Sequence, residues 1–103
     1  MFTPALARNH AVDLELAFVV DASGSIDDDE TRLQRQGYAD ALAHPKVLAA
    51  IGSGFLRSVA VAYIEFAADG GATLSVEWTR ISNAADARTF GAKILARDRM
   101  FCP

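Results

Sequence analysis

The residues best suited to chemistry are one carboxylate and two hydroxyls, Asp21, Ser23 and Ser25, spaced two positions apart. They directly follow an apolar run, and ligand sites in open α/β sheets lie beyond the carboxyl ends of the strands. Hard oxygen ligands of this kind favour Mg²⁺ or Mn²⁺ over zinc or copper. Gly24 lets the loop bend back, so that the three oxygens can face one point. The pattern predicts a metal site formed by Asp21, Ser23 and Ser25.

A second interpretation of the same residues needs no metal. The two serine hydroxyls would then satisfy loop amides, and Asp21 would cap the end of the strand. The surroundings favour the metal site, because Val19 and Val20 precede the motif and an acid-capped helix follows it. In that helix the acids of residues 27–30 are expected to form a capping box and to complement the helix dipole.

Glu65 is a further candidate, because it interrupts an apolar strand near its carboxyl end, at the edge expected to hold Asp21. A buried carboxylate needs a partner or a metal. One interpretation places Glu65 on the rim of the sheet, at the start of a hairpin turn. The other interpretation is that Glu65 holds the metal ligands in place without itself binding the metal.

The elements that must position these residues follow from the hydrophobic pattern. Residues 14–20 are almost continuously apolar, which is typical of a strand buried on both faces. A helix opens at Asp27 and ends before Pro45, and a short helix and a second apolar strand follow. A turn signal leads to a strand with alternating polarity, and Ser82 or Asn83 caps a last helix. The expected ranges are 27–44, 46–51, 57–66, 72–78 and 84–96.

This order of strand, helix, short helix, strand, strand and helix predicts the α/β class. The first two strands must be parallel across a right-handed crossover, and the third returns as a hairpin. The arrangement corresponds to the N-terminal half of a doubly wound, mostly parallel sheet. Within the first helix, Leu33 and Leu42 are expected on the apolar face, and Gly37 is expected to mark a close approach to the sheet.

Length and composition set the outer bounds. The chain has 103 residues, enough for one small domain, and 51% of them are hydrophobic. Thirteen acids against ten bases give a net charge of −3, which argues against nucleic-acid binding. The single cysteine, Cys102, excludes an internal disulfide framework. The longest apolar run, residues 59–64, is far shorter than the roughly 20 residues of a membrane span.

The two ends of the chain carry no periodic pattern. Residues 1–11 are expected to be a loose tail, and they contain neither the basic nor the apolar region of a signal peptide. Ala5 and Ala7 nevertheless have the small-x-small spacing of a cleavage site, so the alternative is the remnant of a leader. His10 and His44 are expected to be solvated or capping residues, and Cys102 a passive thiol.

The segment 18–26, Phe-Val-Val-Asp-Ala-Ser-Gly-Ser-Ile, resembles the opening of a von Willebrand factor A domain. In that family the Asp-x-Ser-x-Ser loop is the first part of a metal-ion-dependent adhesion site. Residues 33–38, 60–66 and 78–81 resemble an uncharacterised bacterial family of exported von Willebrand factor A-like proteins, and the likeness extends from about residue 12 to residue 101. It implies a periplasmic or secreted protein, although the chain as written has no signal peptide.

In the resembled family the chain would continue into a Gly-Gly-Thr loop and later a strand that ends in Asp. Here it ends at Cys102-Pro103. We therefore expect residues 12–103 to form a partial domain that lacks the C-terminal strands and binds metal weakly. The first strand would then be an open edge, through which we expect self-association.

The resemblance implies metal-mediated protein recognition. A partner protein would offer a carboxylate that replaces a water on Mg²⁺, or on Mn²⁺ or Ca²⁺ in its place. The alternative is an inactive, truncated fragment with no metal-dependent activity of its own. A remote alternative is a metal-dependent hydrolase with Asp21 as nucleophile, but the second nearby aspartate that such chemistry requires is missing from the pattern. We therefore expect no enzymatic activity.

Overall fold

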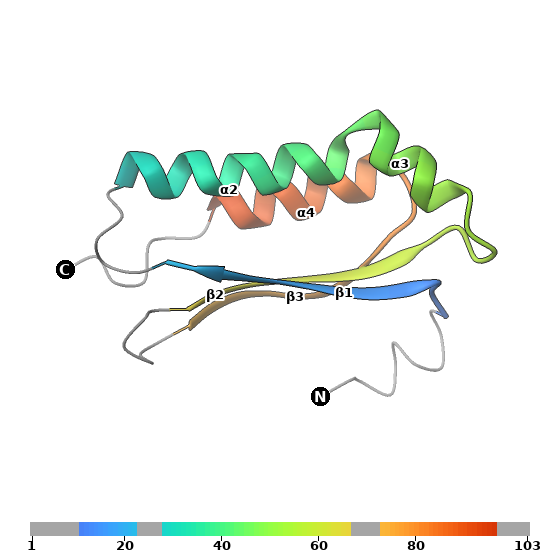
Figure 1. The fold of residues 1–103 in the computed structure, drawn as a ribbon, viewed down its shortest axis with the longest axis horizontal. Helices are drawn as coiled ribbons and strands as arrows, with labels where there is room; N and C mark the ends of the chain where they lie inside the picture. The colour runs from blue at the N-terminus through green and yellow to red at the C-terminus, as the bar shows by residue number, and fades with distance from the viewer. Residues whose placement is uncertain (1–10, 23–27, 67–72, 97–103) are drawn as a thin grey trace.

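The computed structural model describes residues 11–22, 28–66 and 73–96 (Figure 1). The elements follow one another as strand, two helices, two strands and a helix. Their bounds are β1 Leu14–Asp21, α2 Asp28–Ala43, α3 Pro45–Gly52, β2 Val59–Phe66, β3 Thr73–Ile81 and α4 Ala84–Ala96. The prediction of a small α/β domain is confirmed. The second strand begins two residues later than expected, and the third extends three residues further.

The sheet has three strands in the order β1-β2-β3. β1 and β2 are parallel, in a register that pairs Leu14 with Val59 and Asp21 with Phe66. β2 and β3 are antiparallel, with one irregularity between Val61 and Tyr63. The mixed pairing agrees with the expected crossover and hairpin. It also brings the carboxyl ends of β1 and β2 to the same edge of the sheet, which we call the carboxyl edge.

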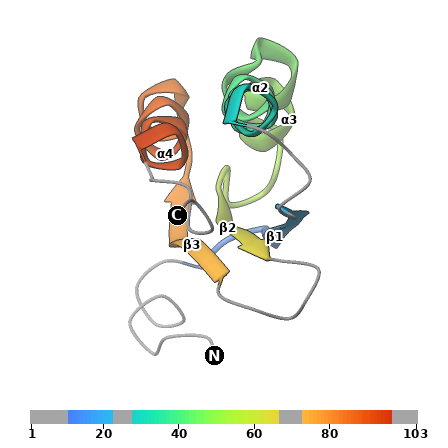
Figure 2. The same cartoon turned by 90° about the vertical axis from the view of Figure 1, so that its left-hand side faces the viewer.

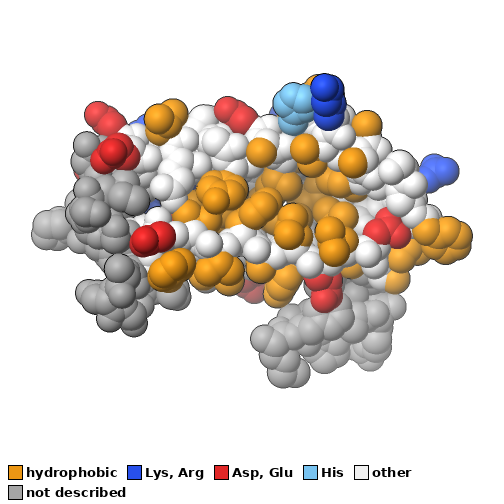
Figure 3. Space-filling model, viewed as in Figure 1, with side chains coloured by type: hydrophobic (Ala, Val, Ile, Leu, Met, Phe, Trp, Pro, Cys, Tyr) orange, Lys and Arg blue, Asp and Glu red, His pale blue; other side chains and the backbone are white. Residues whose placement is uncertain are grey.

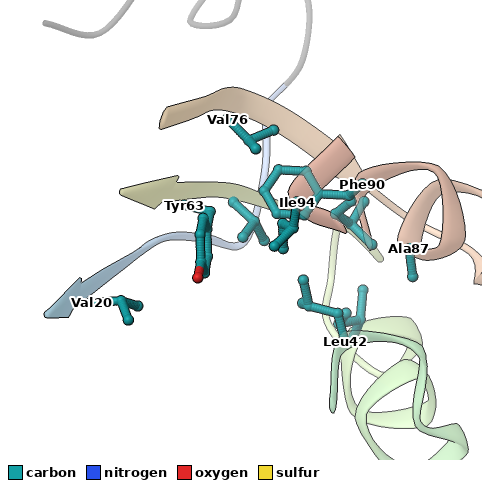
Figure 4. Close-up of a cluster of buried hydrophobic side chains, with 10 residues drawn as sticks. Val20, Leu42, Tyr63, Val76, Ala87, Phe90 and Ile94 are labelled. Atoms are coloured by element: carbon teal, nitrogen blue, oxygen red, sulfur yellow. The ribbon is translucent and has the colours of Figure 1, made fainter. Parts of the chain in front are cut away.

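All three helices lie on one face of the sheet (Figures 1 and 2). α2 runs above β1 and β2, and α4 runs above β3. The core fills the space between the helices and this face (Figure 4). Its buried hydrophobic cluster consists of Val20, Leu42, Ile51, Val61, Tyr63, Val76, Ile81, Ala87, Phe90 and Ile94. Across the described ranges, no helix combines the length and apolar character that crossing a membrane requires.

The expectation that β1 is buried on both faces is wrong for the described part of the chain. Leu14 is 54% exposed and Val19 is 62% exposed, whereas Val20 is 5% exposed. The reason is positional, because β1 is an edge strand and the helices cover only one face. Apolar side chains accordingly gather on the surface along β1 and in the band below α2 and α3 (Figure 3).

The apolar face of α2 also differs from the expected one. The buried residues are Thr31, Arg35, Ala39 and Leu42, whereas Leu33 is 74% exposed. Gly37 marks no close approach, because a Cβ added there would meet nothing within 4 Å. The close approach lies at Gly91 of α4 instead, where a Cβ would lie 3.0 Å from the Cβ of Ala39. The helices α2 and α4 therefore pack through small residues.

The ends of the shorter helices follow the predicted capping chemistry. His44 caps α3, since its Nδ1 accepts a hydrogen bond of 3.0 Å from the Lys46 amide. Asn83 caps α4 in the same manner, through a 2.8 Å bond from the Asp86 amide to its Oδ1. The Asp86 carboxylate in turn accepts from the Ser82 amide at 3.0 Å. Such reciprocal bonds satisfy amides that a helix start leaves without partners.

A tight turn precedes β2 at the edge opposite the carboxyl edge. The Asp13 carboxylate accepts hydrogen bonds of 2.9 and 3.1 Å from the Leu56 amide, and the Asp13 amide donates to the Ser58 carbonyl at 2.8 Å. A Cβ on Gly54 would overlap with the Asp13 carboxylate. Arg57 has a φ of 57°, in the left-handed region. These constraints explain why β2 begins at Val59 and not at Arg57.

The exposed strand β1 leads to the first prediction. We expect the isolated chain to self-associate, because a long apolar edge strand is a template for pairing with another chain. The substitution Val19→Lys should reduce this association, since it places a charge on the edge strand at a position that is 62% exposed. Light scattering over a concentration series measures the effect.

The matched control for this experiment is Leu33→Lys, which adds the same charge at an exposed position on α2. It should leave the association unchanged. A wild-type chain that stays monodisperse and monomeric, with a cooperative melt above about 50 °C, would contradict the prediction.

Candidate functional site

Asp21 lies at the carboxyl edge, as expected. It is the last residue of β1, it is exposed, and it pairs with Phe66, the last residue of β2. Its backbone carbonyl accepts a hydrogen bond from Gln34 Nε2 of α2 at 3.3 Å. The next amide, that of Ala22, donates to the Phe66 carbonyl at 2.8 Å. Both β2 and α2 therefore hold the backbone from which the Asp21 side chain projects.

The remaining predicted ligands, Ser23 and Ser25, lie outside the described residues, as does the expected capping residue Asp27. The described part of the acidic helix start is Asp28, Asp29 and Glu30, the first turn of α2. These three residues are exposed, and α2 begins at the same end of the molecule at which β1 ends (Figure 1). Within the described ranges, no group of three or more His, Cys, Asp or Glu side chains forms a metal-binding cluster.

Glu65 is buried, so the interpretation of this residue as part of an exposed rim is wrong. It is 2% exposed and pairs in the sheet with Val20, one residue before Asp21. Its side chain points toward the helices because the alternation along β2 places it on the same face as Tyr63. The cover that α2 provides over this end of β2 excludes water from the carboxylate.

Arg35 of α2 is the partner of this buried carboxylate. Its Nε donates to Glu65 Oε2 and its Nη2 donates to Glu65 Oε1, both at 2.8 Å. Two parallel bonds of this kind match the planar guanidinium to the carboxylate. Arg35 is itself only 5% exposed. The pair therefore joins α2 to β2 within the protein interior.

Tyr63 completes the network from within β2. Its hydroxyl donates to Glu65 Oε2 at 2.7 Å, and the residue is fully buried. Burial, and then the hydrogen bond to Glu65 and the charge of Glu65, raise the pKa of the Tyr63 hydroxyl well above its usual value. The hydroxyl consequently stays protonated and keeps donating. We call Arg35, Glu65 and Tyr63 the buried triad.

An aromatic row extends from the buried triad to β1. The Tyr63 ring lies 5.6 Å from that of Tyr38 in α2, in an edge-on arrangement. The Tyr38 ring lies 5.1 Å from that of Phe18 in β1, with an interplanar angle of 50°. Tilted and edge-on ring pairs at such separations are the favoured geometries. The row therefore links both strands of the parallel pair to α2.

Sequence reasoning missed Arg35 and so missed the partner of Glu65. The available signal was the acid in an apolar strand, which requires a cation when it is buried. A second signal is that Arg35, Ala39 and Leu42 share one face of a helix, at spacings of four and three residues. The choice of Leu33 and Gly37 as face residues obscured both signals.

The buried triad leads to a prediction about stability. Glu65→Gln should lower the free energy of unfolding by about 3 kcal/mol, because it leaves the charge of Arg35 buried without an anion. Chemical denaturation with an optical readout measures the change. Glu77→Gln is the matched control, since Glu77 is exposed on β3. Equal unfolding midpoints for wild type and Glu65→Gln would show that the pair is not needed for folding.

A third prediction concerns the stability of the protein at alkaline pH. An unfolded tyrosine ionises near pH 10, whereas in the folded protein the raised pKa keeps Tyr63 protonated. The contribution of Tyr63 to stability is thus complete below about pH 10 and is lost as the pH rises beyond it. Phenylalanine at position 63 has no hydroxyl to ionise. The free energy of unfolding of Tyr63→Phe should therefore fall less between pH 10 and 11 than that of the wild type.

Denaturation midpoints of the two proteins at each pH measure the difference. Tyr38→Phe is the control, because it removes a half-buried tyrosine and leaves Tyr63 in place. Parallel curves for wild type and Tyr63→Phe above pH 10 would refute the assignment.

Comparison with known proteins gives one positive result. No curated protein and no solved structure matches the chain. A family model described as "Protein of unknown function (DUF1194)" matches residues 11–102. The match takes in every element of the described fold, from β1 through α4, together with Asp21 and the buried triad. On this evidence the chain belongs to the DUF1194 family.

Proposed function

We propose that the chain is a von Willebrand factor A-like domain that recognises a protein partner through a bound divalent cation. In this proposal Asp21, Ser23 and Ser25 hold Mg²⁺, or Mn²⁺ or Ca²⁺ in its place. A carboxylate of the partner protein completes the coordination of the ion. The proposal combines the Asp-x-Ser-x-Ser pattern of the sequence with the position of Asp21 in the sheet.

The position of Asp21 is the observation that carries the proposal. It is exposed at the last position of β1, in a parallel strand pair whose carboxyl ends share one edge. Ligand sites in α/β sheets lie at this edge. Residues 23 and 25 follow in the sequence within four positions, so their hydroxyls belong to the same neighbourhood of the chain.

The donor chemistry at this edge fits a hard cation. One carboxylate and two hydroxyls are oxygen ligands of the type that Mg²⁺ prefers, and a site with so few protein ligands retains several waters. The exposed acids in the first turn of α2, Asp28, Asp29 and Glu30, add negative charge at the same end of the molecule. This charge raises the local concentration of cations.

The proposal includes no catalytic step. His44 is the only histidine among the described residues. It caps α3 next to the C-terminal end of α2, whereas Asp28 lies at the N-terminal end of α2. The buried carboxylate nearest to Asp21 in the sheet, that of Glu65, already binds Arg35 and Tyr63. Around Asp21 the described residues thus offer oxygen ligands and charge, which suits binding better than proton transfer.

Titration with Mg²⁺ or Mn²⁺ tests the proposal. With three protein ligands we expect a dissociation constant on the order of 1 mM, which corresponds to about 4 kcal/mol. Asp21→Ala should abolish this binding, because it removes the only charged ligand. Isothermal calorimetry measures Mg²⁺ binding, and relaxation of water protons by Mn²⁺ gives an independent measurement.

Glu15→Ala is the matched control, since it removes an exposed carboxylate from the same strand. It should leave the titration unchanged. Micromolar binding that survives Asp21→Ala would place the ion elsewhere. The absence of any saturable binding to the wild type would favour the alternative, a chain with no metal-dependent activity.

A further inference from the structure

We propose that Arg35 is a positioning residue for Asp21 and that, through the buried triad, it sets the affinity of the carboxyl edge for a cation. This inference rests on the proposed function, because it concerns the same edge. Arg35 is not one of the proposed cation ligands. It acts through the elements that hold the backbone of Asp21.

The first step is the attachment of α2 to β2. Glu65 accepts two parallel bonds of 2.8 Å from Arg35 and one of 2.7 Å from Tyr63. All three residues are at most 5% exposed. Because a guanidinium bound through two nitrogens has little freedom to rotate, this contact fixes both the height and the rotation of α2 above the sheet.

The second step leads from α2 to β1. Gln34 is the residue next to Arg35, and its side-chain amide donates to the Asp21 carbonyl at 3.3 Å. A helix that rolled or shifted along the sheet would carry Gln34 away from this carbonyl. The orientation that Arg35 imposes on α2 is therefore the orientation that brings Gln34 to Asp21.

The third step leads through the sheet. Glu65 pairs with Val20, and the next residues along, Phe66 and Asp21, form the last pair of the parallel ladder. The Ala22 amide extends this ladder by its 2.8 Å bond to the Phe66 carbonyl. Asp21 is thus held from two sides, by β2 and by α2, and the buried triad joins these two supports through Glu65, the sheet partner of the preceding residue, Val20.

The chain contains an internal reference for testing this arrangement. The Ala22 amide bonds to the Phe66 carbonyl at the carboxyl edge, and the Asp13 amide bonds to the Ser58 carbonyl at the opposite edge. Both bonds are 2.8 Å long and flank the same pair of strands. Only the first lies beside the buried triad. If the effect of Arg35 is local, a substitution of Arg35 will weaken only the bond of the Ala22 amide. A general loss of stability will weaken the bonds of both amides.

The experiment uses Arg35→Lys, which keeps the positive charge for Glu65 but replaces the planar fork by a single ammonium group. Hydrogen exchange of the metal-free protein is followed for each backbone amide by NMR. We expect the Ala22 amide to exchange several-fold faster than in the wild type, with no change at Asp13. We also expect the Mn²⁺ dissociation constant to rise about tenfold, as is typical when a support of a metal ligand is altered.

Two further variants distinguish a positioning role of Arg35 from a contribution to the overall stability of the protein. Arg35→Met combined with Glu65→Met removes both charges of the buried ion pair, a replacement that folded proteins often tolerate. It should reproduce the effects of Arg35→Lys. Ile81→Ala destabilises the core at the other end of the sheet, where Ile81 pairs with Val59. At a temperature where circular dichroism shows all variants folded, Ile81→Ala should leave Mn²⁺ binding unchanged.

The outcomes distinguish this inference from the proposed function. If Asp21→Ala leaves Mn²⁺ binding unchanged, the proposed function fails whatever the exchange data show. If Asp21→Ala abolishes binding while Arg35→Lys changes neither the exchange of Ala22 nor the dissociation constant, the positioning role alone is overturned. Equal acceleration at Ala22 and Asp13 overturns it as well, because Arg35 would then contribute only to general stability.

Discussion

The burial of one carboxylate, that of Glu65, is the constraint on which the other features of this structure depend. An ionised side chain in the interior needs an opposite charge and saturated hydrogen bonds. Arg35 and Tyr63 meet this need at distances of 2.7 to 2.8 Å. An apolar contact between α2 and the sheet could slide with little cost, but this contact has one favourable arrangement. The fold therefore contains one specific polar contact between α2 and β2 within a largely hydrophobic core.

The two edges of the parallel pair are fixed by different means. At one edge the side chains of Arg35, Glu65 and Tyr63 join a helix to a strand, next to an exposed acid at the end of β1. At the other, Asp13 binds backbone amides of the turn that leads into β2. Between them lie the aromatic row and the buried hydrophobic cluster, and Figure 4 shows that cluster. The polar groups thus set the geometry of the ends, while hydrophobic burial supplies most of the driving force between them.

How much could be predicted from the sequence depended on whether the signal was local. The order of the elements, the parallel crossover and the caps at His44 and Asn83 follow from periodicity and from residues a few positions apart. The position of Asp21 at the carboxyl edge follows from the same reasoning. The apolar run of residues 14–20 did not reveal the exposure of β1, because exposure depends on strand order and on which face the helices cover. The open edge of β1 was expected only from the resemblance to a larger family. The contact between Arg35 and Glu65 joins residues 30 positions apart, so no local spacing identifies one as the partner of the other.

The turn before β2 has a consequence for how sequences of this family can diverge. A side chain at position 54 would occupy the space of the Asp13 carboxylate, and that carboxylate holds the Leu56 amide. The two positions are 41 residues apart in the chain but form one unit in space. A larger residue at position 54 would displace the Asp13 carboxylate, and the Leu56 amide would then need another acceptor. We therefore expect relatives without glycine at position 54 to lack this contact between Asp13 and the Leu56 amide as well.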